Sequence, residues 1–297
     1  MRALKPEYFY RPSQILRRLG YSVGFAKNKS SEMTPWRLRI AFAPGELHGR
    51  AMLTHGLSDL RTCEMISRIV RAGDCVVDIS ANIGIMTSLM AKRACVSGSV
   101  FAFEPHPQTS AWLEKNVCEW SHRDLDCAPV EVLPYALSSR TGTAELVEPA
   151  SFERNSGVAR LLEGGAKGQQ AHQVDTIVFD EWFADVPSIR LVKIDVEGHE
   201  DDVLAGMSDS LADGRIGYLI FEEMRQLPSS SCVFLKDLGY RTYLVDRNFT
   251  GPKLVPTQES PKTLIGEATN VLAVRPGERI DFLQRSDWSS LRGGSTQ

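Results

Sequence analysis

Short apolar runs alternate with stretches of helical length from about residue 75 onward, as in a parallel β-sheet that is covered by helices. Residues 75–79 predict a buried strand, and residues 83–93 carry apolar side chains at helical spacing after it. The same alternation predicts six more strands, at 99–104, 130–137, 189–196, 217–222, 240–245 and 270–274. The pattern therefore favours one α/β domain with a doubly wound, mostly parallel sheet of seven strands and helices on both faces.

Helices are predicted to follow several strands, one beginning at Pro107 and others covering 200–211 and 228–238. Two strand-like runs, at 143–147 and 172–178, flank a long stretch rich in Gly, Ser and Gln. Loops of that length inside a compact domain are often lids over a site. We therefore expect residues 149–171 to form a mobile lid.

The first 69 residues lack this alternation, although they contain a strand-like run at 36–42 and a helical run at 60–70. We expect an N-terminal accessory segment over 1–69, a main domain over 70–276 and a C-terminal tail over 277–297. The last dozen residues, which end in GGSTQ, are predicted to be disordered.

Composition narrows the class of protein. The 297 residues are 42% hydrophobic and 24% charged, values that exclude a disordered, collagen-like or coiled-coil chain. The formal net charge of -3 provides no overall field that would attract nucleic acid, so we expect no nucleic-acid partner. The sequence also allows a homo-oligomer.

The longest uncharged stretch, at 79–91, has 13 residues, which is short of the roughly 20 that a transmembrane helix needs. No apolar run resembling a signal-peptide core precedes Pro12. The six cysteines include no C-x-x-C pair and no zinc-like spacing with the histidines. We therefore expect a cytoplasmic protein with reduced thiols and no transmembrane segment.

Candidate binding residues follow the first two predicted strands, because ligands of doubly wound sheets bind at the carboxyl ends of the strands. Asp78 begins the turn DISANIG, whose small side chains let a ligand approach the backbone. Glu104 ends the second strand, where an acidic side chain typically holds a ribose. An ordinary tight turn and a helix-capping glutamate are the alternative interpretation of the two residues.

The turn has one glycine where a dinucleotide fingerprint has three, so NAD and FAD are disfavoured. A nucleoside that carries an amino-acid tail, such as S-adenosylmethionine, suits this turn better. An NAD-dependent oxidoreductase remains as a weaker hypothesis, because the missing glycines disfavour its cofactor.

A family resemblance rests on DISANIG, VFAFEPHPQ, VEVLPYALSSRTGTAEL, RLVKIDVEGHEDDVL and YLIFEE, which occur in this order. This set resembles the FkbM-type methyltransferases over about residues 70–240. The resemblance implies the class I methyltransferase fold, which is Rossmann-like and has seven strands with the last one antiparallel. It also implies S-adenosyl-L-methionine as the methyl donor.

The resemblance assigns cofactor-binding roles by motif. The methionine end of the cofactor would lie on a turn formed by Asp78, Ser80, Asn82 and Gly84. Glu104 would bind the ribose, and Ala136 at the end of the third strand would border the adenine. The family usually has glycine at the position of Ser80, so a side chain stands where the cofactor would approach.

Acidic side chains and one imidazole crowd the end of the fourth strand in IDVEGHE. Asp195 is a candidate for orienting cofactor and acceptor, and His199 is a candidate base because an unperturbed imidazole titrates near neutral pH. Glu222 ends the fifth strand and is expected to face the cleft, with Glu223 pointing away. Alternatively, His199 is a solvated turn residue. Asp195 and Glu222 supply only two metal ligands, so no metal site is predicted.

The leading hypothesis is an S-adenosylmethionine-dependent O-methyltransferase that acts on a hydroxyl of a sugar, glycan or secondary metabolite, as the resemblance implies. The alternative is a non-catalytic binding or scaffold protein that keeps the fold, a hypothesis motivated by Ser80.

Overall fold

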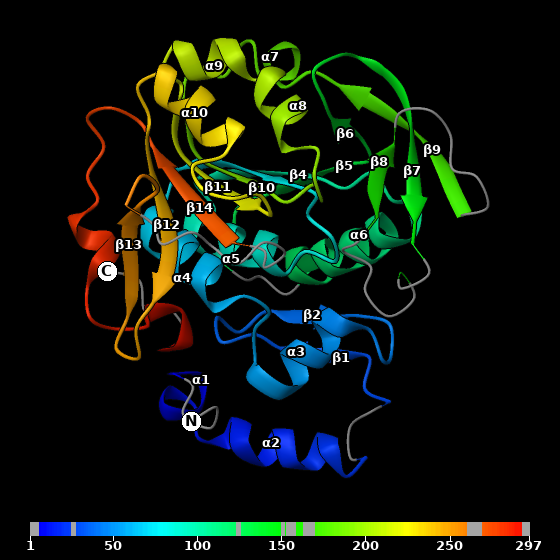
Figure 1. Cartoon of the computed structure of the whole chain (residues 1–297). Coiled ribbons are helices and arrows are strands. Elements are labelled where there is room, and N and C mark those ends of the chain that lie inside the picture. Colours follow the sequence, from blue (N-terminus) through cyan, green and yellow to red (C-terminus); the bar gives the residue numbers. More distant parts are fainter. Residues whose placement is uncertain are drawn as a thin grey trace.

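The computed structural model describes the chain at residues 6–24, 28–122, 126–149, 152, 159–162, 170–259 and 269–292. A twisted central sheet forms the middle of the molecule, with helices on both faces (Figure 1). The order of its strands is β13-β12-β14-β11-β10-β3-β4-β5. Five of them, from β11 to β5, run parallel, whereas β14 lies antiparallel between β11 and β12. This arrangement confirms the predicted α/β fold class.

The strands of this sheet are β3 (Cys75–Ile79), β4 (Ser99–Phe103), β5 (Val130–Leu133), β10 (Ile189–Ile194), β11 (Ile216–Glu223), β12 (Arg241–Arg247), β13 (Pro252–Pro256) and β14 (Thr269–Val274). All seven predicted strands are present, and β13 is an eighth. It pairs with β12 at the edge of the sheet. Its two terminal residues are prolines, which have no N–H to donate to a neighbouring strand and are therefore found mainly in edge strands.

Helices cover both faces of the central sheet. One face carries α7 (Phe179–Trp182), α8 (Glu200–Ala205), α9 (Ser208–Ala212) and α10 (Ser230–Asp237), and the other carries α4 (Leu60–Ile69), α5 (Ile85–Ala94) and α6 (Pro107–His122) (Figure 1). The single helix predicted over 200–211 is wrong, because two short helices occupy that range. The chain breaks at Gly206, where a Cβ would collide with the carbonyl oxygen of Ser138.

A second sheet stands beside the first, with the order β6-β9-β7-β8. It comprises β6 (Ala136–Leu137), β7 (Gly142–Glu148), β8 (Arg160–Leu162) and β9 (Gln170–Ile177). The predicted third strand is therefore divided: its first part joins the central sheet, and its last two residues join the second. Pro134 lies at the division, where it has no N–H for a continuous ladder. Most of the predicted lid at 149–171 lies outside the described residues, and of the rest, β8 and the first two residues of β9 pair with β7.

The N-terminal segment packs below the central sheet in Figure 1. It contains α1 (Pro6–Tyr10), α2 (Ser13–Ser22), β1 (Ser31–Met33), β2 (Arg39–Ala41) and α3 (Leu47–His55). Its buried Trp36, Leu38 and Phe42 belong to the same apolar core as α4 and α5. Asn116 of α6 ties β2 in place, accepting from the amide of Ala41 and donating to its carbonyl.

Within the predicted tail, the described residues 281–292 are folded. They form two 3₁₀ turns, Asp281–Gln284 and Ser289–Arg292. Trp288 is fully buried, and Ser289 and Ser290 donate backbone and side-chain hydrogen bonds to Glu64 of α4. The prediction of disorder is therefore wrong for 286–292, where a buried carboxylate on another element holds the chain. Residues 293–297 lie outside the described part.

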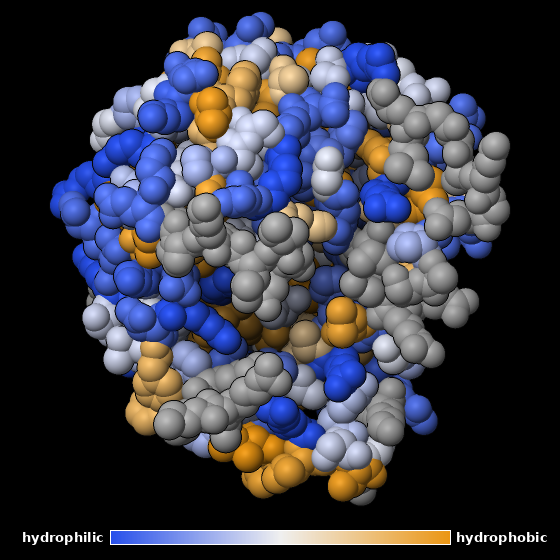
Figure 2. All heavy atoms as spheres, in the orientation of Figure 1, coloured by the Kyte–Doolittle hydropathy of each residue, from blue (hydrophilic) through white to orange (hydrophobic). Residues whose placement is uncertain are grey.

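An apolar patch covers α2 at the bottom of the molecule (Figure 2), where Leu16, Leu19 and Val23 are exposed.

None of the helices in the described part of the chain combines the length and the apolar character that a bilayer crossing requires.

Candidate active site

The turn after β3 is unusually tight. Ser80, Asn82 and Gly84 all adopt left-handed backbone conformations, with φ of 58°, 52° and 89°. A Cβ on Gly84 would lie 2.6 Å from a methyl group of Leu113, so only glycine fits at the start of α5. The conformation of Ser80 is the one that glycine adopts most readily, which explains why a glycine is usual there. Serine at this position costs about 1 kcal/mol of backbone strain.

Below this turn, Asp78 is fully buried and is held by two partners. The hydroxyl of Thr87 donates to Asp78 Oδ2 at 2.7 Å, and Lys193 Nζ lies 3.2 Å from Asp78 Oδ1. Lys193, near the carboxyl end of β10, also donates to the carbonyl oxygen of Ser80 at 2.9 Å. A single ammonium group therefore neutralises the buried carboxylate and fixes the backbone of the turn.

Burial by itself would lower the pKa of Lys193, because it disfavours the charged amine. The carboxylates of Asp78 and Asp195 outweigh that effect and raise its pKa. Asp195 Oδ2 lies 3.6 Å from Nζ, so Lys193 joins the turn after β3 to the end of β10.

Glu104 is buried beside the same turn. Its carboxylate accepts from the backbone amides of Asn82 at 2.8 Å and His106 at 3.0 Å. Burial raises the pKa of Glu104 to about 7, even though both amides favour the ionised form. The carboxyl group is thus placed where the turn after β3 meets the end of β4, and it titrates near neutral pH.

Two cavities adjoin this turn. The larger, of about 260 Å³, is lined by the turn, by the ends of β10, β11 and β14, and by the start of α3. The smaller is lined on opposite sides by Pro105 and Val196, and Ala136 also borders it. Ser80 lines both cavities, so its side chain stands at their junction.

Three carboxylates gather in the larger cavity. Asp195, Glu197 and Glu222 each offer an oxygen within 4.8 Å of the others. Asp195 follows β10 directly, and Glu222 lies near the end of the neighbouring β11. Glu197 reaches the same place because it has a φ of 51° and Gly198 a φ of 100°, so the chain turns sharply after β10.

Asp195, Glu197 and Glu222 form a carboxylate cluster, in which burial and repulsion favour the protonated forms of Glu197 and Glu222. Burial, followed by the charge of Asp195, raises the pKa of Glu197 to about 7 and that of Glu222 to about 8. Groups with such values can accept or release a proton near neutral pH.

The other predicted residues lie differently. Asp78, Gly84, Glu104 and His199 are not among the residues that line the two cavities. His199 Nε2 is 3.0 Å from the hydroxyl of Ser138, and its Nδ1 is 3.5 Å from Asp202. The structure thus brings Ser80, Asn82, Asp195 and Glu222 together and leaves His199 outside that group.

Glu222 and Glu223 separate as strand alternation predicts. Glu222 lines the larger cavity, whereas Glu223 is buried and binds Arg225 at 2.8 Å. Arg225 also binds Asp201 at the start of α8, so Glu223 belongs to an ion network away from the cavity.

Sequence reasoning gave no role to three residues that the cavity contains. Lys193 was visible as a charge inside the apolar run of 191–194. His48 of α3 lines the cavity and contacts Ser58 through Nδ1 at 3.2 Å. Asn270 lies beside Glu222 in the register of β14 and donates to Asp59 at 2.6 Å. The last two come from distant segments that carry no local motif.

The family model of the methyltransferase FkbM domain matches residues 78–242, which is more than half of the chain. The chain belongs to the FkbM methyltransferase family. The matched range contains the turn after β3, Glu104 and the carboxylate cluster. It confirms the family resemblance of the sequence, and the central sheet has the strand arrangement of the class I methyltransferase fold that the resemblance implied.

Two curated relatives and one solved structure are similar to this FkbM-family chain. The hexuronic acid methyltransferase AglP of Haloferax volcanii is 32% identical over 174 residues, covering 56% of this chain and 64% of that protein. Methyltransferase 1 of Beauveria bassiana is 30% identical over 153 residues, covering 45% and 58%. The chain therefore spans less than two thirds of either relative. The structure of methyltransferase FkbM from Methylobacillus flagellatus is 12% identical, with a TM-score of 0.42 over 89% of this chain and 71% of that one.

Proposed function

We propose that this protein is an S-adenosylmethionine-dependent O-methyltransferase whose acceptor is an uncharged hydroxyl of a sugar or glycan. The observation that carries the proposal is the arrangement of one cavity, in which the family's cofactor turn lies with three carboxyl groups, two of which, Glu197 and Glu222, have raised pKa values.

The residues at the turn fit the cofactor. Ser80 and Asn82 line the larger cavity in a turn at the N-terminus of α5, and the positive end of the helix favours a carboxylate such as that of methionine. Glu104 would accept hydrogen bonds from the ribose hydroxyls, and Ala136 in the smaller cavity would border the adenine. The bound cofactor supplies an electrophilic methyl group on a sulfonium.

The carboxylate cluster would bind and deprotonate the acceptor. Carboxylates accept hydrogen bonds from hydroxyl groups, and Glu222, with a pKa of about 8, can take a proton from a hydroxyl as its oxygen reacts. Holding the two reacting atoms in line contributes much of the rate in a single displacement. We assign Asp195 to orienting the acceptor, because Lys193 already pairs with it.

The N-terminal accessory segment would complete the acceptor side, since Leu47 and His48 of α3 line the larger cavity. We propose that the accessory segment, residues 1–69, determines which acceptor the main domain from residue 70 onward can bind.

The sugar class is suggested by the relative whose name includes hexuronic acid. The cavity itself favours an uncharged sugar. Asp59 adds a fourth carboxyl group to the lining beside the cluster, whereas Lys193 is the only lysine or arginine among the described lining residues. When Glu197 and Glu222 are ionised, the state in which Glu222 can act as a base, an ionised uronic acid would be repelled by this surplus of negative charge.

Wild-type protein is expected to bind S-adenosylmethionine in a calorimetric titration, and Glu104→Gln is expected to bind at least about tenfold more weakly. Because the pKa of Glu104 is about 7, about half of the group is ionised at that pH and about one tenth at one pH unit below it. Wild-type affinity should therefore fall about fivefold between those two pH values, relative to the change in Glu104→Gln. The matched control is Glu131→Gln, an exposed glutamate on β5. Absence of binding to the wild type would reject the cofactor assignment.

A methyl-transfer assay with paired acceptors tests the substrate class. We expect transfer to a neutral hexoside to be at least about tenfold faster than transfer to the corresponding hexuronoside, equivalent to about 1.4 kcal/mol of electrostatic discrimination. Mass spectrometry would locate the methyl group on a hydroxyl oxygen. A faster reaction with the uronate contradicts the preference for an uncharged acceptor. Cofactor binding without transfer to any sugar, glycan or metabolite hydroxyl supports the non-catalytic alternative.

A further inference from the structure

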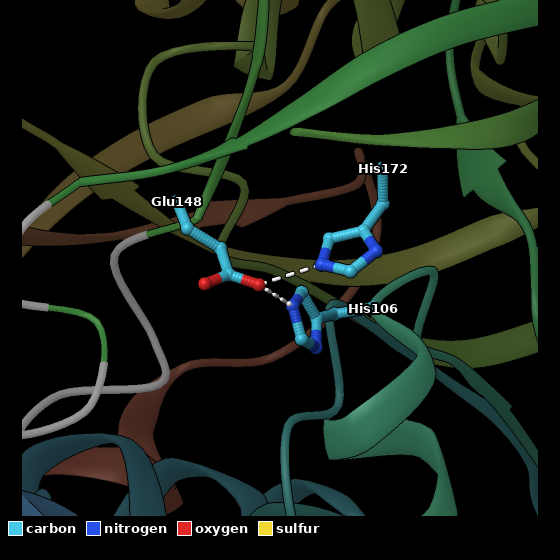
Figure 3. Close-up of side chains that lie close together, drawn as sticks. All are labelled: His106, Glu148 and His172. Atoms are coloured by element: carbon cyan, nitrogen blue, oxygen red, sulfur yellow. Dashed lines mark hydrogen bonds and ion pairs between the residues drawn. The ribbon is translucent and has the colours of Figure 1, made fainter. Parts of the chain in front are cut away.

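Two histidines and a glutamate converge outside the two cavities. His106 Nε2 lies 2.9 Å from Glu148 Oε1, and His172 Nε2 lies 2.6 Å from the same oxygen (Figure 3). The three ligand atoms are all within 4.8 Å of one another. None of the three residues lines either cavity, so the cluster is distinct from the candidate active site.

The fold builds this meeting point from separate elements. His106 follows Glu104 in the segment between β4 and α6, Glu148 ends β7, and His172 lies in β9. In the antiparallel register Leu146 faces His172, and alternation puts Glu148 on the same side of the sheet as Leu146. The second sheet thus presents a carboxylate and an imidazole to the segment that follows Glu104.

The site is largely shielded from water. The side chain of His106 is 2% exposed and that of Glu148 is 13% exposed, while His172 is 29% exposed at the rim. The buried ring of Phe152 packs on His106, with the ring centres 4.4 Å apart. Burial lowers the pKa of His106, which favours the neutral imidazole that binds metals.

The donor set suits a transition metal. Two imidazole nitrogens and one carboxylate oxygen are ligands that Zn²⁺ takes at about 2.0–2.2 Å, with a fourth position for water. Both Nε2 atoms already contact the same oxygen of Glu148, so small rotations of the three side chains would place a zinc ion between their ligand atoms. A set with two imidazoles favours Zn²⁺ over Mg²⁺ or Ca²⁺, which prefer oxygen.

The surroundings also permit the necessary change of tautomer. Without metal, each Nε2 donates its proton to Glu148, because a carboxylate only accepts. In the ring of His106, Nδ1 then accepts from the backbone amide of Thr109 at 3.4 Å. With metal at Nε2, the proton moves to Nδ1, which gives up this long bond and donates to the hydroxyl oxygen of Thr109, 3.3 Å away. A neutral ring therefore exchanges one proton position for the other, with no net release, and keeps a hydrogen-bond partner at Nδ1.

We propose that His106, Glu148 and His172 form a divalent zinc site that fastens the segment after Glu104 to the second sheet. The metal would join β7 and β9 to the segment that follows Glu104, and its fourth position, left to water, distinguishes it from the closed four-ligand sites of zinc fingers. The backbone amide of His106 donates to Glu104, so the metal also steadies a residue of the candidate cofactor site.

Zinc content and thermal melting of the full-length protein test this proposal. After incubation with Zn²⁺ and removal of excess ion, wild type should retain about one equivalent, and zinc should raise its melting temperature. His172→Gln and Glu148→Gln should each weaken zinc binding at least about tenfold and lose the thermal shift. His172 is at the rim, so its variant is expected to stay folded. Loading with Co²⁺ adds a visible spectrum that reports imidazole ligation independently of activity.

Two controls separate this site from other ligands. His122→Asn removes an exposed histidine that lies 3.5 Å from the thiol of Cys118, and it should retain the zinc. Glu197→Gln removes a member of the carboxylate cluster and should also retain it. Retention of zinc by a folded His172→Gln, loss of zinc in Glu197→Gln, or absence of zinc binding by wild type would each overturn the proposal.

Discussion

Replacing Lys193 with methionine is expected to destabilise the folded protein by about 3–5 kcal/mol, because it leaves a buried carboxylate without its counter-charge. Asp78 is fully buried, and after the substitution it keeps only the hydrogen bond from Thr87. The carbonyl oxygen of Ser80 loses its donor at the same time. Denaturant unfolding followed by circular dichroism measures the change.

A second substitution isolates the cause. Adding Asp78→Asn to Lys193→Met removes the buried negative charge while keeping an acceptor for Thr87, so the double variant should recover part of the lost stability. Lys236→Met, an exposed lysine of α10, is the matched control and should change stability by less than about 0.5 kcal/mol. A Lys193→Met variant as stable as this control would show that the ion pair is not what holds the turn.

The central sheet could be predicted from the sequence because its strands are continuous apolar runs, buried on both faces. Residues 75–79 and 189–194 are examples in which the pattern alone marks the strand. β13 escaped prediction because its stability comes from a neighbour: a proline-bounded segment becomes a strand when β12 offers an edge. Likewise, Trp288 is held by a core that β14, α4 and the chain end share, and such distant packing leaves no local signal.

Some residues of the candidate site could likewise be predicted from the sequence, whereas others could not. The turn after β3 and Glu104 could be predicted because each is fixed by its own strand end. Glu197 enters the carboxylate cluster through a left-handed backbone angle that nothing in IDVEGHE specifies. The cluster of His106, Glu148 and His172 depends on the register of β7 against β9. Register follows from burial across both strands, so the spacing of these residues in the sequence contains no sign that they meet.

Glu222→Gln is expected to lower the rate of methyl transfer by about 10²–10⁴-fold, the usual contribution of a positioned general base. The wild-type rate should rise with pH through about 8, where Glu222 loses its proton, and the variant should lose this dependence. A kcat measurement at saturating cofactor and acceptor separates this effect from binding. The exposed Glu114→Gln of α6 is the matched control and should keep both the rate and the pH profile.

The same substitution should make the protein more stable at alkaline pH. The pKa of Glu222 is raised to about 8 by burial and by the charges of Asp195 and Glu197, whereas an unfolded glutamate titrates near about 4.3. Between those values the folded state binds more protons than the unfolded state, so wild-type stability falls as the pH rises through this window. Glutamine cannot ionise, and the stability of Glu222→Gln should fall less steeply over the same range. A variant that is slower yet more stable would show that Glu222 is kept in this cavity for chemistry, because a residue that serves only the fold loses stability when it is removed. A rate equal to wild type, or a stability profile parallel to wild type, would assign the proton transfer to another group.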